Sequence, residues 1–121
     1  TVLVEPLGPR RTNFLNTMKE IAEFIPRVRM ENLASLISLR ELGPIGLPPP
    51  DLPEFSQLIE HVQLENPHRY DGPRLSPRRD DGCDYRPYFQ ALKDAEYSAD
   101  FSLPGDADAE ALSFCRSLWN G

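Results

Sequence analysis

Short apolar runs alternate with amphipathic stretches along the 121 residues of this chain, and this alternation restricts the fold more than any other feature. Val2–Val4, Leu58–Leu64 and Ala99–Leu103 have the length and composition of buried strands. Strands and helices that alternate in sequence form parallel β/α units, in which the helices cover the outside of the sheet. The sequence therefore predicts an α/β fold.

The helices of this pattern are predicted from caps and prolines. Thr17, with a glutamate three residues later, has the spacing of a capping box, and Pro26 is predicted to end the helix that follows. A second helical segment is predicted over Asn32–Leu42, because its large aliphatic residues recur mostly on one face. Asp84 and Asp108 are the caps of the last two predicted helices.

The middle of the chain is rich in loop signals. Its 13 prolines are about twice the usual share, and most lie between residues 44 and 87. Residues 43–54 are predicted to form a Pro-rich spacer loop, and residues 65–84 a long polar loop. Loops of that length in compact domains are often binding elements. A chain of this size holds one modest core, so residues 1–121 are predicted to form a single domain.

Charge and cysteine usage exclude several classes of protein. The net charge of −6 is wrong for binding a phosphate backbone, so no nucleic-acid partner is predicted. No apolar run approaches the roughly 20 residues that span a bilayer. Cys83 and Cys115 fit neither a metal pattern nor a disulfide framework, which favours free thiols and a cytoplasmic location. Because Thr1 lies directly before a predicted strand, we expect a fragment, a processed product or one half of a larger assembly.

Polar residues gather where the predicted strands end. Glu5 closes the first strand, residues 63–69 follow the middle strand, and Leu103 lies at the end of the last. In parallel β/α folds, chemistry collects at the carboxyl ends of the strands. These segments are therefore predicted to form one active-site face.

Three passages on that face resemble the motifs of one family. Glu5–Leu7 is similar to a strand end in Glu-Pro-Leu, and His61–Gln63 with Arg69 is similar to a His-Val-His strand followed by an arginine. Residues 84–97 resemble a passage from an aspartate through a helix to a tyrosine. Taken together and in this order, the three passages resemble the xylose isomerase-like barrel family of sugar isomerases and epimerases. The resemblance implies a partial (β/α)8 TIM barrel, about its C-terminal half.

The resemblance also implies a divalent metal, Mn, Mg or Co, bound by two glutamates, an aspartate and a histidine. Glu5 stands at the first ligand position and is also the candidate base. Gln63 replaces the histidine with a poor amide ligand, and Leu103 replaces the last glutamate. The aspartate-bearing strand is either missing or crudely replaced by Glu31, and we favour a missing segment. Glu65 is a candidate replacement for a lost ligand.

Two residues are candidates for binding a sugar or sugar-phosphate substrate. Arg69 keeps the spacing at which the family holds a substrate hydroxyl or phosphate oxygen, and a surface salt bridge is equally consistent. His61 lies on the same strand face as Gln63 by alternation. A hydrogen-bonded core histidine is the competing interpretation of His61.

Two functions of different classes follow from these residues. The first is a divergent sugar or sugar-phosphate isomerase or epimerase, ancestrally a metal-dependent proton-transfer enzyme, with a degraded metal site. The second is a non-catalytic binding or assembly subunit derived from the barrel. A zinc nuclease requires more than the two histidines present. Half a barrel has open sheet edges, so we expect the other half-barrel or an oligomeric partner to cover them.

Overall fold

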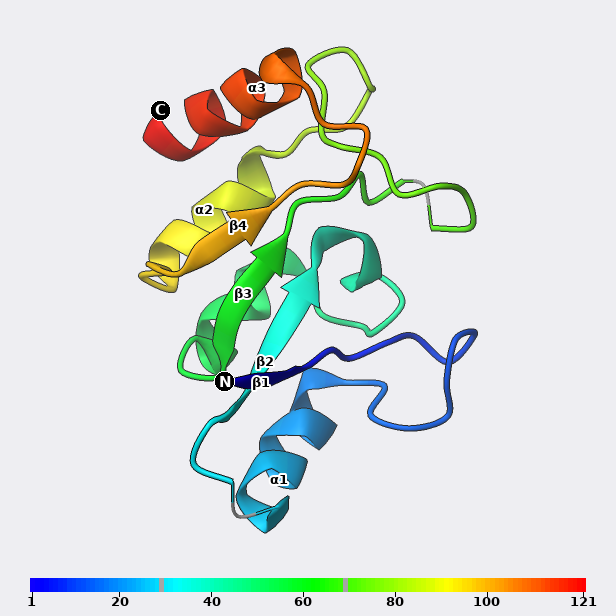
Figure 1. Cartoon of the computed structure of the whole chain (residues 1–121), viewed down its shortest axis with the longest axis vertical. Helices are drawn as coiled ribbons and strands as arrows, with labels where there is room; N and C mark the ends of the chain where they lie inside the picture. The colour runs from blue at the N-terminus through cyan, green and yellow to red at the C-terminus, as the bar shows by residue number, and fades with distance from the viewer. Residues whose placement is uncertain (29, 69) are drawn as a thin grey trace.

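The computed structural model of the chain describes residues 1–28, 30–68 and 70–121. These residues contain a parallel sheet with the strand order β1-β2-β3-β4 (Figure 1). Its strands are β1 (Val2–Val4), β2 (Leu33–Ser38), β3 (Ile59–Gln63) and β4 (Asp100–Ser102). Parallel neighbours require a crossover between them, and the intervening helical segments supply it. The predicted α/β class and parallel β/α organisation are confirmed.

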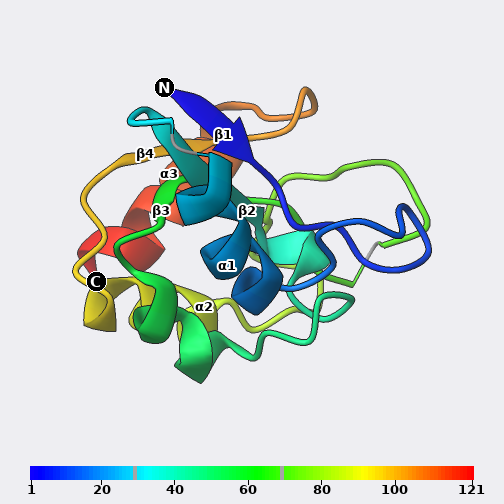
Figure 2. The ribbon, with the colours of Figure 1, turned by 90° about the horizontal axis from the view of Figure 1, so that it is seen from below.

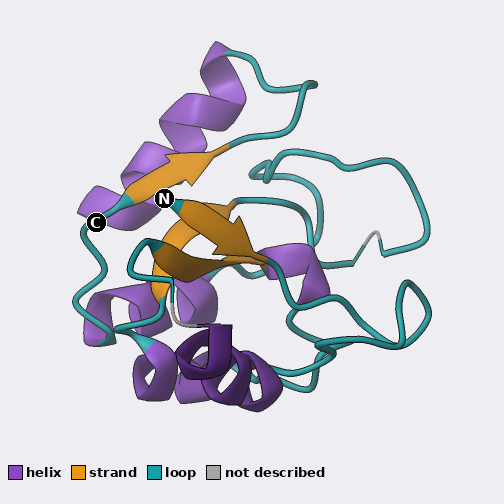
Figure 3. Cartoon of the chain, turned by 60° about the horizontal axis from the view of Figure 1, so that its bottom comes forward, coloured by secondary structure: helices purple, strands orange, loops and turns teal. Residues whose placement is uncertain are grey.

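Helices cover the sheet, whereas the loops that follow β1 and β3 extend away from it and lie side by side (Figures 2 and 3). The segment η2 packs against α2, so part of the predicted Pro-rich loop is a short 3-10 helix. The helical segments are α1 (Met18–Val28), α2 (Arg86–Asp94) and α3 (Ala109–Asn120), with the 3-10 helices η1 (Leu39–Glu41) and η2 (Pro49–Phe55).

Two of the three helix caps predicted from sequence are present; the cap at Asp84 was wrong, because Tyr85 precedes α2 and no side chain caps it. The Thr17 hydroxyl accepts a hydrogen bond from the Glu20 amide at 3.1 Å, as in a capping box. An Asp108 carboxylate oxygen accepts from the amide of Ala111 at 2.9 Å and caps α3. The first helix continues past Pro26 to Val28, so the predicted end was two residues early. Proline lies there within the last turn of the helix.

The second predicted helix, over Asn32–Leu42, was wrong. Residues Leu33–Ser38 form β2, and η1 follows directly. This strand lies between β1 and β3 and is largely buried. A strand buried in this way reads as a continuous apolar run, which periodicity cannot separate from a buried helix. The strand that we expected to be missing after the first helix is therefore present as β2.

The register of the strands gives the sheet one apolar and one polar face. Val62 pairs with Ile37 on one side and with Phe101 on the other, and all three belong to the hydrophobic cluster packed under the helices. Gln63 pairs with Ser38 and Ser102 in the next row. Because successive side chains of a strand point to opposite faces, this polar row lies on the face away from that cluster.

Candidate functional site

The polar row continues around His61. The Nε2 atom of His61 lies 2.9 Å from the Ser102 hydroxyl oxygen, which joins β3 to β4 across the polar face. The Ser38 hydroxyl donates to Oε1 of Glu65 at 3.1 Å, which joins β2 to the residues after β3. The polar side chains of three neighbouring strands therefore interact on one face of the sheet.

A polar pocket opens where β3 and β4 end, and we call it the strand-end pocket. Its volume is about 200 Å³. Its lining residues come from the two strand ends and the long loop 65–84. They are Gln63, Glu65, Arg74, Ser102, Leu103 and Pro104.

Glu65 is the most buried charged group of this pocket. Its side chain is 3% exposed, and its Oε1 accepts hydrogen bonds from Arg74 at 2.6 Å and from Ser38 at 3.1 Å. Its second oxygen, Oε2, is buried and has no partner among the described residues. Oε1 of Gln63 is likewise buried and has no hydrogen-bond partner among the described residues. Buried acceptors without partners are unfavourable, so these two oxygens are suited to accept hydrogen bonds from a ligand.

Glu5 lies immediately after β1 and belongs to the same electrostatic cluster. Burial raises the pKa of the Glu5 carboxyl above its ordinary value of 4.5, and the positive charge of Arg74 opposes that rise. The negative charges of Glu41 and Glu65 raise the pKa further. Oε1 of Glu5 is also buried without a hydrogen-bond partner among the described residues. Glu5 is therefore a carboxyl group that holds its proton more tightly than an exposed glutamate.

Glu41, the last residue of η1, forms an ion pair and a hydrogen bond with the loop after β1. Its side chain is buried, with Oε1 2.8 Å from Nε of Arg11 and Oε2 accepting from the backbone N–H of Gly8 at 3.2 Å. Arg11 in turn lies over the Tyr70 ring, 4.5 Å from its centroid. Sequence reasoning missed Glu41 because it lay inside a predicted helix. The signal was an Arg-Glu pair placed directly after a buried apolar run.

Arg40 is a buried cation beside this cluster. The residue is 5% exposed, and its Nη2 donates to the Tyr70 carbonyl oxygen. Its Nε and Nη1 have no hydrogen-bond partner among the described residues, and no carboxylate within that part of the chain forms an ion pair with it. A buried charge with unsatisfied donors normally destabilises a fold.

The residues predicted from sequence are only partly brought together. Glu5 follows the end of β1 and Gln63 ends β3, as predicted. His61 lies in the middle of β3 and makes the hydrogen bond that its competing interpretation required. Glu31 is exposed in the turn before β2. It is therefore at the opposite end of the strands from Glu5 and cannot share a ligand with it. The prediction for Arg69 lies outside the described residues.

The metal site implied by the resemblance does not fit these residues. Within residues 1–28, 30–68 and 70–121, no group of three or more His, Cys, Asp or Glu side chains could hold a metal ion. The two unpartnered carboxylate oxygens belong to Glu5 and Glu65, and the other oxygen of Glu65 is already bound to Arg74. Two carboxylates and one amide are poorer than the four-ligand set that was expected.

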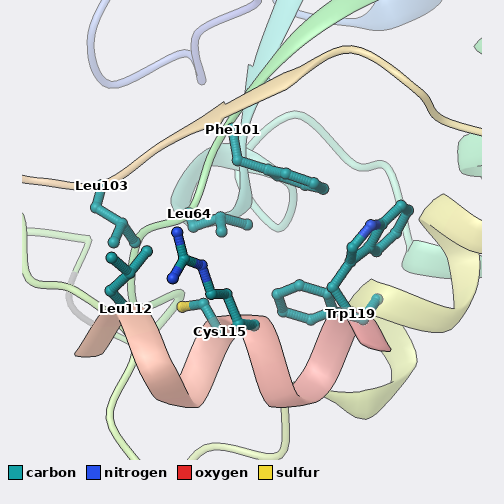
Figure 4. Close-up of a pocket in the computed structure, with 8 residues that line it drawn as sticks. Leu64, Phe101, Leu103, Leu112, Cys115 and Trp119 are labelled. Carbon is teal, nitrogen blue, oxygen red and sulfur yellow. The ribbon is translucent and has the colours of Figure 1, made fainter. Parts of the chain in front are cut away.

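A second pocket lies on the apolar side, between β4 and α3 (Figure 4). It has a volume of about 340 Å³, and Phe101, Leu103 and Trp119 contribute to its lining. Leu103 follows Ser102 by one residue, so its side chain faces the helices rather than the polar row. Burial raises the pKa of the Cys115 thiol in this lining to about 11, so it is not a thiolate at neutral pH. The strand-end pocket is therefore the better chemical candidate, although it is smaller.

Solved structures of sugar epimerases share this fold. An L-ribulose 3-epimerase matches 100% of this chain over 40% of its own, with a TM-score of 0.69 and 20% identity. A xylose isomerase domain protein from Alicyclobacillus acidocaldarius matches 98% of this chain over 50% of its own, with a TM-score of 0.76 and 19% identity. A 3-keto-D-glucoside 4-epimerase from E. coli matches 97% of this chain over 46% of its own, with a TM-score of 0.75 and 18% identity.

The fold of this chain therefore matches about half of the TIM-barrel chains of these proteins, as the sequence motifs predicted. The chain spans 40% to 50% of the length of these three structures. No protein-family model matches the sequence, and no curated protein matches it either. Among the described residues, no helix is long and apolar enough to cross a membrane.

Proposed function

We propose that this chain is a divergent sugar or sugar-phosphate isomerase- or epimerase-like protein with a degraded metal site, and that the strand-end pocket binds the carbohydrate. The observation that carries the proposal is the pair of buried, unpartnered oxygens on Gln63 and Glu65 beside that pocket. Sugar hydroxyls are hydrogen-bond donors, and they would satisfy these acceptors. The fold relation to sugar epimerases supports the same class of ligand.

Glu5 is the proposed proton-transfer group. A carboxyl group whose pKa is raised by burial is a better proton acceptor than an exposed glutamate, which suits it to exchange a proton with a substrate. Its unpartnered Oε1 is available to accept that proton. The predicted role of Arg69 in holding a substrate oxygen remains part of this proposal. Arg74, at the pocket, is a second arginine that could donate to the ligand.

The alternative is a non-catalytic carbohydrate-binding subunit. It is favoured by the donor set, because no group of three metal-binding side chains exists among the described residues. A pocket with acceptors and an arginine can bind a polyol without moving a proton. The two functions therefore share a binding site and differ in turnover.

The barrel relation also implies further β/α units. Within the described sheet, β1 and β4 each have a neighbour on one side only. Open strand edges pair readily with other strands. We propose that the other half-barrel covers them, and sedimentation of the chain with and without such a unit tests this.

The free thiols of Cys83 and Cys115 support the predicted cytoplasmic location.

A ligand titration tests the site. Amide chemical shifts of the isotope-labelled chain are followed while D-fructose, D-tagatose, L-ribulose and their phosphates are added. Gln63→Leu removes the unpartnered amide and should weaken binding about tenfold, whereas Gln57→Leu, at an exposed position, should not change it. Loss of binding in neither variant, or no binding by the natural chain, contradicts the proposed site.

Turnover separates the two functions. Each bound sugar is incubated with the chain in D2O, and deuterium incorporation at carbon is measured by NMR. Incorporation that Glu5→Gln abolishes supports the enzyme. Binding without incorporation supports the non-catalytic subunit.

A further inference from the structure

The strand-end pocket already contains a cation that belongs to the chain. Nη1 of Arg74 lies 2.6 Å from Oε1 of Glu65, a charge-assisted hydrogen bond to a side chain that is 3% exposed. The Arg74 side chain itself is 47% exposed and lines the pocket. Its guanidinium therefore reaches from the surface to a buried carboxylate.

The charges around this contact are unevenly matched. The carboxyl groups of Glu41 and Glu65 lie close enough to Glu5 to raise its pKa. Glu41 has its own cation, because Arg11 is 2.8 Å away. Arg74 is the strongest charge acting on Glu5 and is also the ion-pair partner of Glu65. One guanidinium thus serves two partly buried carboxyl groups, which is the electrostatic task of a metal ion.

We infer that the Arg74 guanidinium takes the place of a divalent cation between Glu5 and Glu65, and that it presents its remaining N–H groups to a carbonyl or hydroxyl oxygen of the ligand. The inference rests on the proposed function for the class of ligand. The placement of the charge does not depend on that function. The 2.6 Å contact places the guanidinium against Glu65, and its charge also acts on the nearby Glu5 carboxyl.

This arrangement makes the pocket independent of metal. Arginine stays protonated throughout the working pH range and offers directional donors to an oxygen atom. It carries one charge rather than two, so it polarises a carbonyl less than a divalent ion does. Ligand binding is therefore expected to be unchanged by a chelator.

Removing the guanidinium should uncover a cation site. In Arg74→Ala, Glu65 and Gln63 at the pocket and the nearby Glu5 carboxyl lose the guanidinium that acts on them. One or two carboxylates with water suffice to bind Mg²⁺ or Mn²⁺ weakly. At a Mn²⁺ concentration of roughly ten times the dissociation constant, Tm should rise by about 5 °C. The natural chain should show no rise.

Three matched variants make the experiment decisive. Arg74→Lys keeps the positive charge and should remain insensitive to Mn²⁺. Arg74→Ala combined with Glu65→Gln should lose the gained binding. Arg86→Ala removes an exposed arginine whose ion pair is with Asp84 and should behave as the natural chain does. Calorimetric titration checks that the rise in Tm reflects stoichiometric binding.

Two results overturn the inference. One is Mn²⁺ binding by the natural chain with an affinity that Arg74→Ala leaves unchanged. The other is a folded Arg74→Ala variant, shown by circular dichroism, that gains no Mn²⁺ response. Because no sugar is present in these titrations, their failure would leave the proposed carbohydrate binding standing, and failure of the sugar titrations would leave the role of Arg74 standing.

Discussion

The buried Arg40 side chain is predicted to lower the stability of the fold. The residue is 5% exposed, one of its nitrogens donates to the Tyr70 carbonyl, and Nε and Nη1 have no partner among the described residues. We predict that Arg40→Met stabilises the protein. Methionine retains most of the aliphatic volume and removes the buried charge.

The size of the effect follows from the hydrogen bonds of the Arg40 guanidinium. Two unpaired buried donors cost about 1–3 kcal/mol each, whereas the charged hydrogen bond contributes about 1.5–3 kcal/mol. The guanidinium also lies 5.9 Å from the centroid of the Tyr70 ring, a cation–π contact that contributes about 0.5–1 kcal/mol. The balance is an increase of about 1 kcal/mol in the free energy of unfolding. With a urea m-value of about 2 kcal/mol/M, the midpoint should rise by about 0.5 M.

Urea denaturation followed by tryptophan fluorescence measures this change. Arg10→Met is the control, because the Arg10 side chain is 69% exposed and pairs with the equally exposed Asp71. Its effect should stay within about 0.5 kcal/mol. A lower midpoint for Arg40→Met, at an unchanged m-value, would refute the reasoning and show that the buried guanidinium stabilises the fold.

Two further predictions concern titration. Burial raises the pKa of Glu5, so its contribution to stability is complete below the ordinary value of 4.5 and declines as pH rises through the raised pKa. Glu5→Gln should flatten this decline in Tm as pH rises above 4.5, and an unchanged slope would argue against it. Burial likewise raises the pKa of Cys83 and Cys115 to about 11. Both thiols should react slowly with iodoacetamide at about pH 8 in the folded chain and quickly in urea, and rapid labelling of the folded chain would contradict this.

Local signals in the sequence predicted much of the fold. The caps at Thr17 and Asp108 needed only neighbouring residues, and both are present in the structure. The alternation in β3 placed His61 and Gln63 on one face correctly. These features are short-range, so a pattern of a few residues determines them.

The errors come from features that a local pattern cannot determine. Leu33–Ser38 was assigned to a helix because burial of the strand between two neighbours hides its alternation. The site was incomplete for a related reason. The contact of Glu65 with Arg74 joins a strand end to a long polar loop, and Arg11 reaches Glu41 across 30 residues. Such pairs follow from the tertiary fold, and neither arginine stands in a motif.

The link between Glu65 and Arg74 spans nine residues of one loop. A diffusible ion must be captured from solution, and its occupancy follows supply, competition from other metals and the presence of chelators. A cation on the polypeptide has a local concentration that the length of the loop determines. The positive charge in this pocket is consequently encoded in the sequence, and it is in place as soon as the chain has folded.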